Sequence, residues 1–159
     1  MDGEARLKAL LSLYHYYAHA EVMRFEFHRY ELKEARQQSV DTPFPAPPDP
    51  KEAGPSAFSL YWFAALWPLV EGWGQLGLRD NDIDSHLKAA GHVSDLRRFR
   101  NVVYHFQPDW SHDARVLAFN NNKELVRWAM NLSNAFRAFF ARANDKESAV
   151  WEWVDGSSQ

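Results

Sequence analysis

Proline is concentrated in one short segment of this chain. Six of its eight prolines lie within residues 39–55. Clustered prolines favour an extended, polyproline-like conformation, which can serve as a stiff spacer or as a ligand for SH3-type domains. A stiff connector between two antiparallel helices is the simpler interpretation. The segments on either side of this connector are then expected to form the folded core.

Apolar residues on both sides of the connector recur at helical spacing, and no segment alternates as a β-strand would. We predict long helices over residues 3–38, 57–76, 94–107 and 123–143, a short helix over 82–90, and turns near 114–119 and 147–154. The whole chain, residues 1–159, is therefore expected to form a single all-α domain. The expected architecture is an up-and-down bundle of four to five helices with a Pro-rich loop at 39–55.

Capping residues suggest where these helices begin and end. Asp80 or Asn81 is expected to cap the short helix, and Gly91 is expected to end it. Ser94 has the chemistry of an N-cap for the helix that follows, and Pro108 is expected to stop that helix. The Asn120–Asn122 run is expected to cap the final long helix.

Composition limits the class of protein. Apolar residues make up 46% of the chain and aromatic residues 15%, which favours a folded core with bulky layers and an aromatic interface. With no cysteine, the chain has no disulfide, no Cys-ligated zinc and no thiol catalysis. A net charge of −3 argues against non-specific coating of nucleic acid but leaves room for a small basic site. No signal peptide or membrane span is apparent, so we expect a soluble, cytoplasmic protein.

The segment 94–107 combines a core stripe with an unusual set of polar residues. The expected core stripe is formed by Leu96, Phe99, Val103 and Phe106. Asn101 and His105 lie one turn apart on the opposite side, whereas Arg100 is rotated by about 140° from His105. A shared site therefore needs Arg100 to bend round on its long side chain, or it needs residues from two helices.

An arginine, an amide and a histidine, without a carboxylate pair or a metal cluster, suit cleavage of an RNA phosphodiester. Histidines titrate near neutral pH and can accept the 2′-hydroxyl proton or protonate the leaving oxygen. An arginine can neutralise the charge that develops on the phosphoryl oxygens. The alternative is an ordinary helix with solvated arginines.

The run Arg100-Asn101-Val102-Val103-Tyr104-His105 resembles the signature of the HEPN family, in which an arginine and a polar residue precede a histidine at a fixed short distance. The resemblance implies a homodimer whose two motif helices form one composite cleft. It also implies a metal-independent endoribonuclease that leaves a 2′,3′-cyclic phosphate, in a toxin–antitoxin or antiphage role, with no cofactor. Arg100 and His105 would be catalytic and Asn101 would support them. The candidate substrate-binding residues are Arg97, Arg98, Tyr104 and Glu71.

The chain departs from the HEPN pattern at one position. HEPN toxins that a partner nucleotidyltransferase silences carry a tyrosine two residues after the histidine, and this chain has Gln107 there. Control by adenylylation is therefore not expected. A different antitoxin or partner protein is still a possible partner. Two alternatives stay open: a catalytically inactive HEPN bundle that binds a nucleotide or a protein, and a helical interaction protein that works through its aromatic surface.

Three other polar features have simpler interpretations. Glu71 follows an apolar stretch and must either reach solvent or pair with an arginine of the 94–107 helix. His15 and His19 lie one turn apart, with Glu26 further along, but a zinc site needs more ligands than this pair offers. Asp82, Asp84 and His86 resemble metal ligands by type, yet acidic residues are common in the first turn of a helix.

Overall fold

The computed structural model describes residues 1–31, 55–105, 122–143, 145 and 149–156. Over these ranges the protein is all-helical, which confirms the predicted fold class. The helices are α1 (Gly3–Glu31), α2 (Pro55–Leu76), α3 (Asn81–Leu87), α4 (Ala90–Tyr104), α6 (Lys123–Ala143) and α7 (Ala149–Asp155). Residues 39–54 of the predicted connector and the predicted turn at 114–119 lie outside the described residues.

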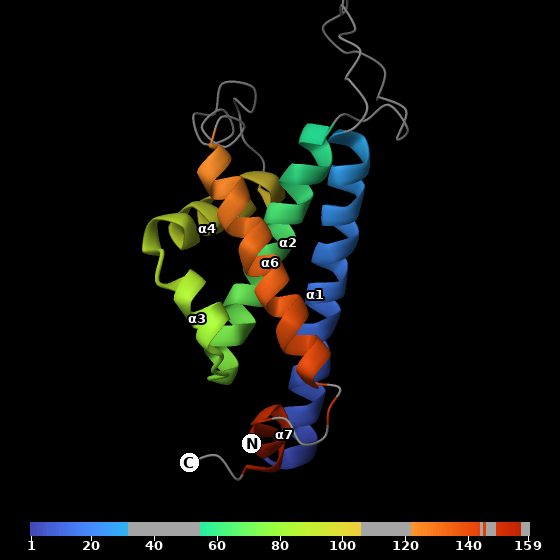
Figure 1. The fold of residues 1–159 in the computed structure, drawn as a ribbon, viewed down its shortest axis with the longest axis vertical. Coiled ribbons are helices and arrows are strands. Elements are labelled where there is room, and N and C mark those ends of the chain that lie inside the picture. Colours follow the sequence, from blue (N-terminus) through green and yellow to red (C-terminus); the bar gives the residue numbers. More distant parts are fainter. Residues whose placement is uncertain (32–54, 106–121, 144, 146–148, 157–159) are drawn as a thin grey trace, which may run out of the picture.

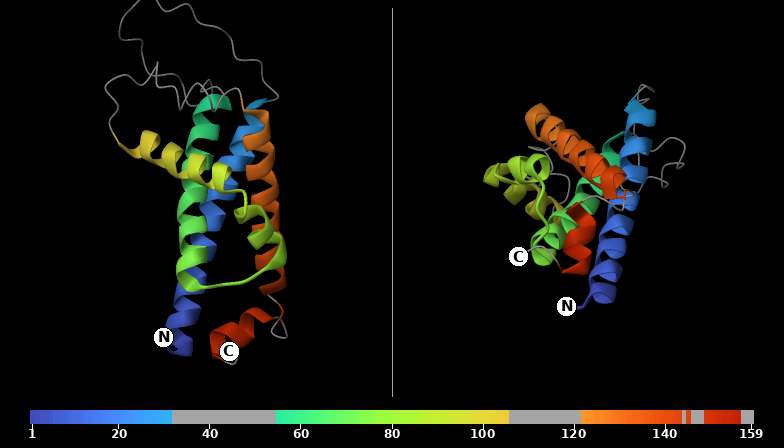
Figure 2. Two further views of the ribbon diagram at one scale, coloured as in Figure 1. Left: turned by 90° about the vertical axis from the view of Figure 1, so that its left-hand side faces the viewer. Right: turned by 60° about the horizontal axis from the view of Figure 1, so that its bottom comes forward.

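The three long helices α1, α2 and α6 run along the length of the molecule, and α1 and α2 are antiparallel (Figure 1). Helix α4 instead crosses α2 at a steep angle (Figure 2) and so departs from the predicted up-and-down arrangement. It lies on the side of the molecule away from α1. No helix in the described ranges is both long and apolar enough to cross a bilayer.

Large aromatic residues fill the core between the long helices. Trp62, Phe63, Trp73 and Phe136 are almost completely buried. Trp73 meets Phe136 and Phe139 edge to face, with ring centroids 5.5 and 4.9 Å apart, the geometry that aromatic quadrupoles favour. The predicted inward face of α6 is confirmed, because all of its members are buried: Leu125, Trp128, Ala129, Leu132, Ala135, Phe136 and Phe139.

Helix α3 is short, but hydrogen bonds tie it to both α2 and α6. Asp80 caps it as predicted, with its Oδ1 accepting from the backbone N–H groups of Asp82 and Ile83. The indole Nε1 of Trp73 in α2 donates to Asp84 Oδ1 over 3.0 Å. From α6, Trp128 Nε1 donates to the carbonyl oxygen of His86 over 3.0 Å, and Arg142 forms an ion pair with Asp80. These contacts fix α3 although it has only seven residues.

The boundary between α3 and α4 differs from the prediction. Helix α3 ends at Leu87 and α4 begins at Ala90, so Gly91 and Ser94 both lie inside α4. In the described ranges only Gly77 and Gly156 have positive φ, the conformation that makes a glycine an effective helix stop. Gly91 has no such conformation and therefore continues the helix, and the turn is made by Lys88 and Ala89 instead.

Candidate functional site

Helix α4, which carries the motif, is anchored by the buried side chains of Leu96, Phe99 and Val102. The ring of Phe99 lies 6.0 Å from that of Phe63 in α2. Val103, the expected third member of the core stripe, is only partly buried, and Phe106 lies outside the described residues. The steep crossing explains why Val102 rather than Val103 is buried. At this angle the residues of α4 that pack against α2 are spaced three apart, at positions 96, 99 and 102.

Arg100 bends towards Asn101. Its Nη1 donates to Asn101 Oδ1 over 3.0 Å, and both side chains are partly buried. The contact shows the arginine bent along its own helix. A site shared with His105, within one chain or between two, stays a prediction. The guanidinium carries five N–H donors, so the contact with Asn101 leaves others for a ligand.

His105 lies beyond the end of α4. It is the C-cap residue, with extended backbone angles (φ −121°, ψ 138°), and its N–H donates to the carbonyl oxygen of Asn101 over 3.1 Å. The predicted helical continuation to residue 107 is therefore wrong, because the chain leaves the helix at His105, before Pro108 can act as a stop. The side chains of His105 and Tyr104 are both exposed.

Two further arginines lie on the solvent side of α4. Arg97 and Arg98 are exposed, and the guanidinium of Arg97 lies 5.9 Å from the ring centroid of Trp67 in α2, a cation–π geometry. We use the name α4 basic face for Arg97, Arg98, Arg100, Asn101, Tyr104 and His105. This face is an open helix surface with a positive charge on each of its three arginines.

Glu71 is not brought to the α4 basic face. It is exposed and lines a cavity of about 350 Å³ together with α1 and α2 residues, among them Tyr16 and Gln75. None of the arginines in the described ranges forms an ion pair with it. Of the two fates predicted for this carboxylate, exposure to solvent is correct.

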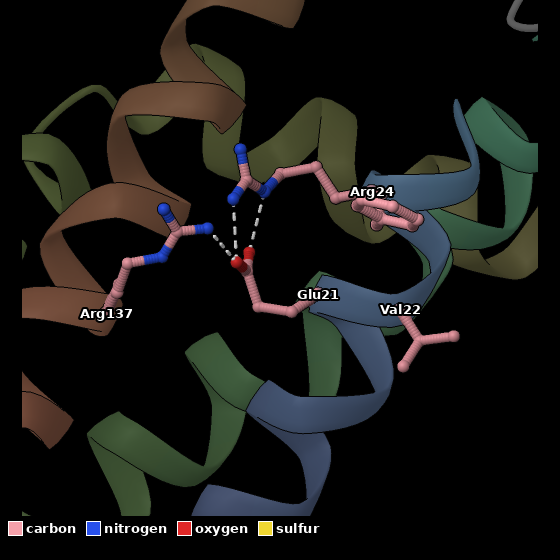
Figure 3. Close-up of a pocket in the computed structure, with 5 residues that line it drawn as sticks. Glu21, Val22, Arg24 and Arg137 are labelled. Atoms are coloured by element: carbon pink, nitrogen blue, oxygen red, sulfur yellow. Dashed lines mark hydrogen bonds and ion pairs between the residues drawn. The ribbon is translucent and has the colours of Figure 1, made fainter. Parts of the chain in front are cut away.

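A second polar cluster joins α1 to α6 and was not predicted. The carboxylate of Glu21 accepts two hydrogen bonds of 2.7 Å from Arg24, one from Nε and one from Nη2. Its Oε2 also forms an ion pair with Arg137 of α6, as Figure 3 shows. In sequence the only visible signal was the three-residue spacing of Glu21 and Arg24. These residues, with Val22 and Phe25, line a cavity of about 490 Å³.

Tyr17 belongs to the same α1–α6 contact. Burial raises the pKa of its phenol above the ordinary value of 10.0, and a hydrogen bond with Arg137 partly opposes that shift. The same hydrogen bond raises the pKa of Arg137. Arg137 therefore stays charged and links Tyr17 to Glu21.

The residues that resemble metal ligands have other surroundings. His15 and His19 are exposed on α1. Asp84 accepts a hydrogen bond from Trp73, and the His86 carbonyl accepts one from Trp128. Across the part of the chain that the structure describes, no three His, Asp or Glu side chains are grouped to hold a metal ion.

Comparison of the chain with protein-family models, with curated proteins and with solved structures found no match.

Proposed function

We propose that the protein is a metal-independent endoribonuclease that acts on RNA through the α4 basic face. His105 would exchange protons with the 2′-hydroxyl or the leaving 5′-oxygen, and Arg100 would neutralise the phosphoryl oxygens as charge develops. The 2′-oxygen would attack the neighbouring phosphorus, and the 5′-oxygen would leave with a proton. The products are a 2′,3′-cyclic phosphate and a 5′-hydroxyl end.

The observation that carries this proposal is the contact between Arg100 and Asn101. It holds the guanidinium beside Asn101, whose carbonyl oxygen accepts from the N–H of the exposed His105. Arg97 and Arg98 add positive charge along the same helix, which suits a phosphate backbone. The resemblance of this run to the HEPN signature supports the same roles, within a toxin–antitoxin or antiphage system in the cytoplasm.

A homodimer through α4 belongs to this proposal. In one copy the α4 basic face is open, and neither cavity described above includes any of its residues. A second α4 facing the first would enclose the phosphate and supply a second arginine–histidine pair. An antitoxin or other partner protein that covers this face would then silence it.

The same openness favours a second candidate, a module that binds a nucleotide or RNA without cleaving it. Arg97 beside Trp67 offers a cation and an aromatic ring to a nucleotide, and neither group needs an acid–base partner to bind. This function would use Arg97 and Arg98 more than His105.

Incubation of the purified protein with RNA in EDTA separates these candidates. We expect cleavage with cyclic-phosphate ends, reduced roughly 10²–10⁴-fold by His105→Ala and about 10²–10³-fold by Arg100→Ala. Arg79→Ala, which removes an exposed arginine outside α4, is the matched control and should cleave normally. Cleavage that survives in both motif variants would refute the assignment. RNA binding without cleavage, lost in an Arg97→Ala/Arg98→Ala variant, would establish the binding module.

A further inference from the structure

The seam between α1 and α2 contains the cavity that Glu71 lines. Its volume is about 350 Å³, within the roughly 300–1,000 Å³ range of small-molecule sites. On α1 its lining runs from Ala9 to Tyr16, which is about 10 Å along the helix axis. On α2 it includes Glu71, Gly72 and Gln75. We call this space the α1–α2 cavity.

Small residues make room for the α1–α2 cavity. Gly72 lets the two helices approach closely, because a Cβ atom at this position would lie 2.8 Å from Leu13 Cδ1. Leu13 is buried at this contact and gives the cavity an apolar wall. Ala9 and Ser12 also line the cavity from α1, and their short side chains leave the space beside Leu13 unfilled.

Glu71 brings an unbalanced negative charge to this cavity. Among the described residues that line it, Glu71 is the only one with a charge. It forms no ion pair with any residue in the described ranges. Gln75 lies one turn further along the same face of α2, with about 5–6 Å between the two Cβ atoms. One small ligand group can therefore meet both the carboxylate and the amide.

The packing of the helices brings an aromatic ring to the same place. Helices α1 and α2 are antiparallel (Figure 1), and Leu13 lies at the level of Gly72. Tyr16, three residues after Leu13, is then within about 3 Å of Glu71 along the axis. Its side chain is exposed and lines the cavity from the α1 side. A carboxylate, an amide and an aromatic ring are thus grouped around one apolar wall.

We propose that the α1–α2 cavity binds an organic monocation, a primary ammonium group on a small apolar body. An ammonium group has three N–H donors, which suit the Glu71 carboxylate and the Gln75 amide oxygen. The face of the Tyr16 ring attracts the same cation. The apolar body of the ligand then packs along Leu13.

Two other kinds of cation fit this cavity less well. Ca²⁺ and Mg²⁺ take about six or more oxygen ligands and are usually held by several carboxylates or by phosphate, whereas Glu71 is the only carboxylate among the described lining residues. A basic polypeptide segment would need further acidic residues along its path. The single charge and the short cavity match a molecule of roughly ten non-hydrogen atoms.

Three ligands of one shape and different charge test the proposal. Phenethylamine is protonated at pH 7, as the lysine side chain is, phenylethanol is neutral and phenylacetate is an anion. Each is titrated into the isotope-labelled full chain, and amide NMR shifts are followed. We expect saturable shifts near residues 12–16 and 71–76 with phenethylamine, with a dissociation constant on the order of 1 mM for its roughly nine non-hydrogen atoms. Phenylethanol should bind at least about fivefold more weakly, and phenylacetate more weakly still.

Equal affinity for the amine and the alcohol would overturn the proposal, because Glu71 and Tyr16 would then contribute nothing to recognition. So would the absence of a saturable shift with phenethylamine up to about 20 mM, well above the expected dissociation constant.

Substitutions locate the binding site. Glu71→Gln should weaken phenethylamine binding about fivefold or more and leave phenylethanol binding unchanged. Glu124→Gln is the matched control, because it removes an exposed carboxylate of α6 that does not line the cavity. Ser12→Leu fills the cavity without changing its charge and should abolish binding. Binding that survives both Glu71→Gln and Ser12→Leu would place the ligand elsewhere and contradict the proposal.

A lysine derivative distinguishes a free amine from a side chain of another protein. Nα-acetyl-lysine amide carries the same ammonium group on a peptide unit. It should bind more weakly than phenethylamine, because its amide groups lose water beside the apolar wall formed by Leu13. Tighter binding of this derivative would show that the cavity receives a protein side chain, and would overturn the assignment to a small amine.

This inference is independent of the proposed nuclease. None of the residues of the α4 basic face lines the α1–α2 cavity. Ser12→Leu should therefore leave RNA cleavage intact, and His105→Ala should bind phenethylamine normally. Loss of both cleavage and amine binding in Ser12→Leu would show that the variant is misfolded, which circular dichroism checks directly, and Ala9→Leu then repeats the test.

Discussion

At the scale of single residues, one polar group in the core is a hydroxyl. Ser133 in α6 is 1% exposed and is the one buried polar side chain in the described ranges. Its Oγ has no hydrogen-bond partner in this part of the chain. An unsatisfied buried hydroxyl costs free energy, whereas an apolar group of similar shape does not.

Replacement of Ser133 by alanine should therefore stabilise the protein. We expect Ser133→Ala to raise the free energy of unfolding by about 1 kcal/mol, measured by urea denaturation. Ala129→Ser, which places a hydroxyl at another fully buried position of α6, should have the opposite effect. A loss of stability in Ser133→Ala would show that the hydroxyl has a partner outside the described residues.

The hydrogen bond between Trp73 and Asp84 gives a second prediction at this scale. Asp84→Ala leaves the indole N–H of a core tryptophan without its acceptor, so we expect a loss of about 1–2 kcal/mol. Asp84→Asn keeps an acceptor and should lose less. Asp82→Ala, at an exposed position of the same first turn, should change stability by only a few tenths of a kcal/mol; a large effect there would mean that helix capping dominates.

At the scale of helices, the spacing of apolar residues predicts a helix best where one of its faces packs against the core along the whole helix. Helix α6 is the clearest case, since its bounds and its buried face both match the prediction. Asn122 caps it, with its Oδ1 accepting a hydrogen bond from the Leu125 N–H. The predicted boundary between α3 and α4 was wrong because a glycine ends a helix only when its φ is positive. The residue type alone does not specify that conformation. The steep crossing of α4 was likewise invisible, because it depends on contacts with α2.

The same limit applies to the candidate site. Spacing identified Arg100 and Asn101, but the hydrogen bond between their side chains is visible only in the structure. Because α4 ends at Tyr104, His105 has an extended backbone, and a helical wheel cannot predict the direction of its side chain. The Glu21, Arg24 and Arg137 cluster joins residues more than a hundred positions apart, and only the packing of α1 against α6 brings them together.

Two glycines test the corrected helix boundaries. Gly91 lies in the first turn of α4 with open space around the position of a Cβ atom, so Gly91→Ala should stabilise the protein by about 0.5–1 kcal/mol. Gly77 has φ +64° at the end of α2, where alanine is strained, and Gly77→Ala should destabilise it by about 1 kcal/mol. Thermal unfolding of both variants measures these changes in stability. Destabilisation by Gly91→Ala would indicate that Gly91 ends a helix after all.

At the scale of the whole molecule, the contact between α1 and α6 makes stability sensitive to alkaline pH. The folded pKa of Tyr17 lies above its ordinary value of 10.0, so the unfolded chain releases this proton at lower pH than the folded one does. The stabilising contribution is complete below pH 10 and is lost as pH rises through the folded pKa. Stability should therefore fall more steeply above pH 10 in the wild type than in Tyr17→Phe, as urea titrations at successive pH values would show. Equal slopes would mean that the Tyr17 phenol has the same pKa in both states.

The link between α3 and α4 has a consequence for motion. Only Lys88 and Ala89 join the two helices, and α3 is held to α2 and α6 through its own hydrogen bonds. Helix α4 packs mainly against α2, and its His92 also meets Trp128 of α6 with ring centroids 5.4 Å apart. We therefore expect α4 to open more readily than α3. Amide hydrogens of α4 should then exchange with deuterium as one cooperative group, ahead of those in α2 and α6. The surface that carries Arg100 would open and close as a unit while the rest of the protein stays folded.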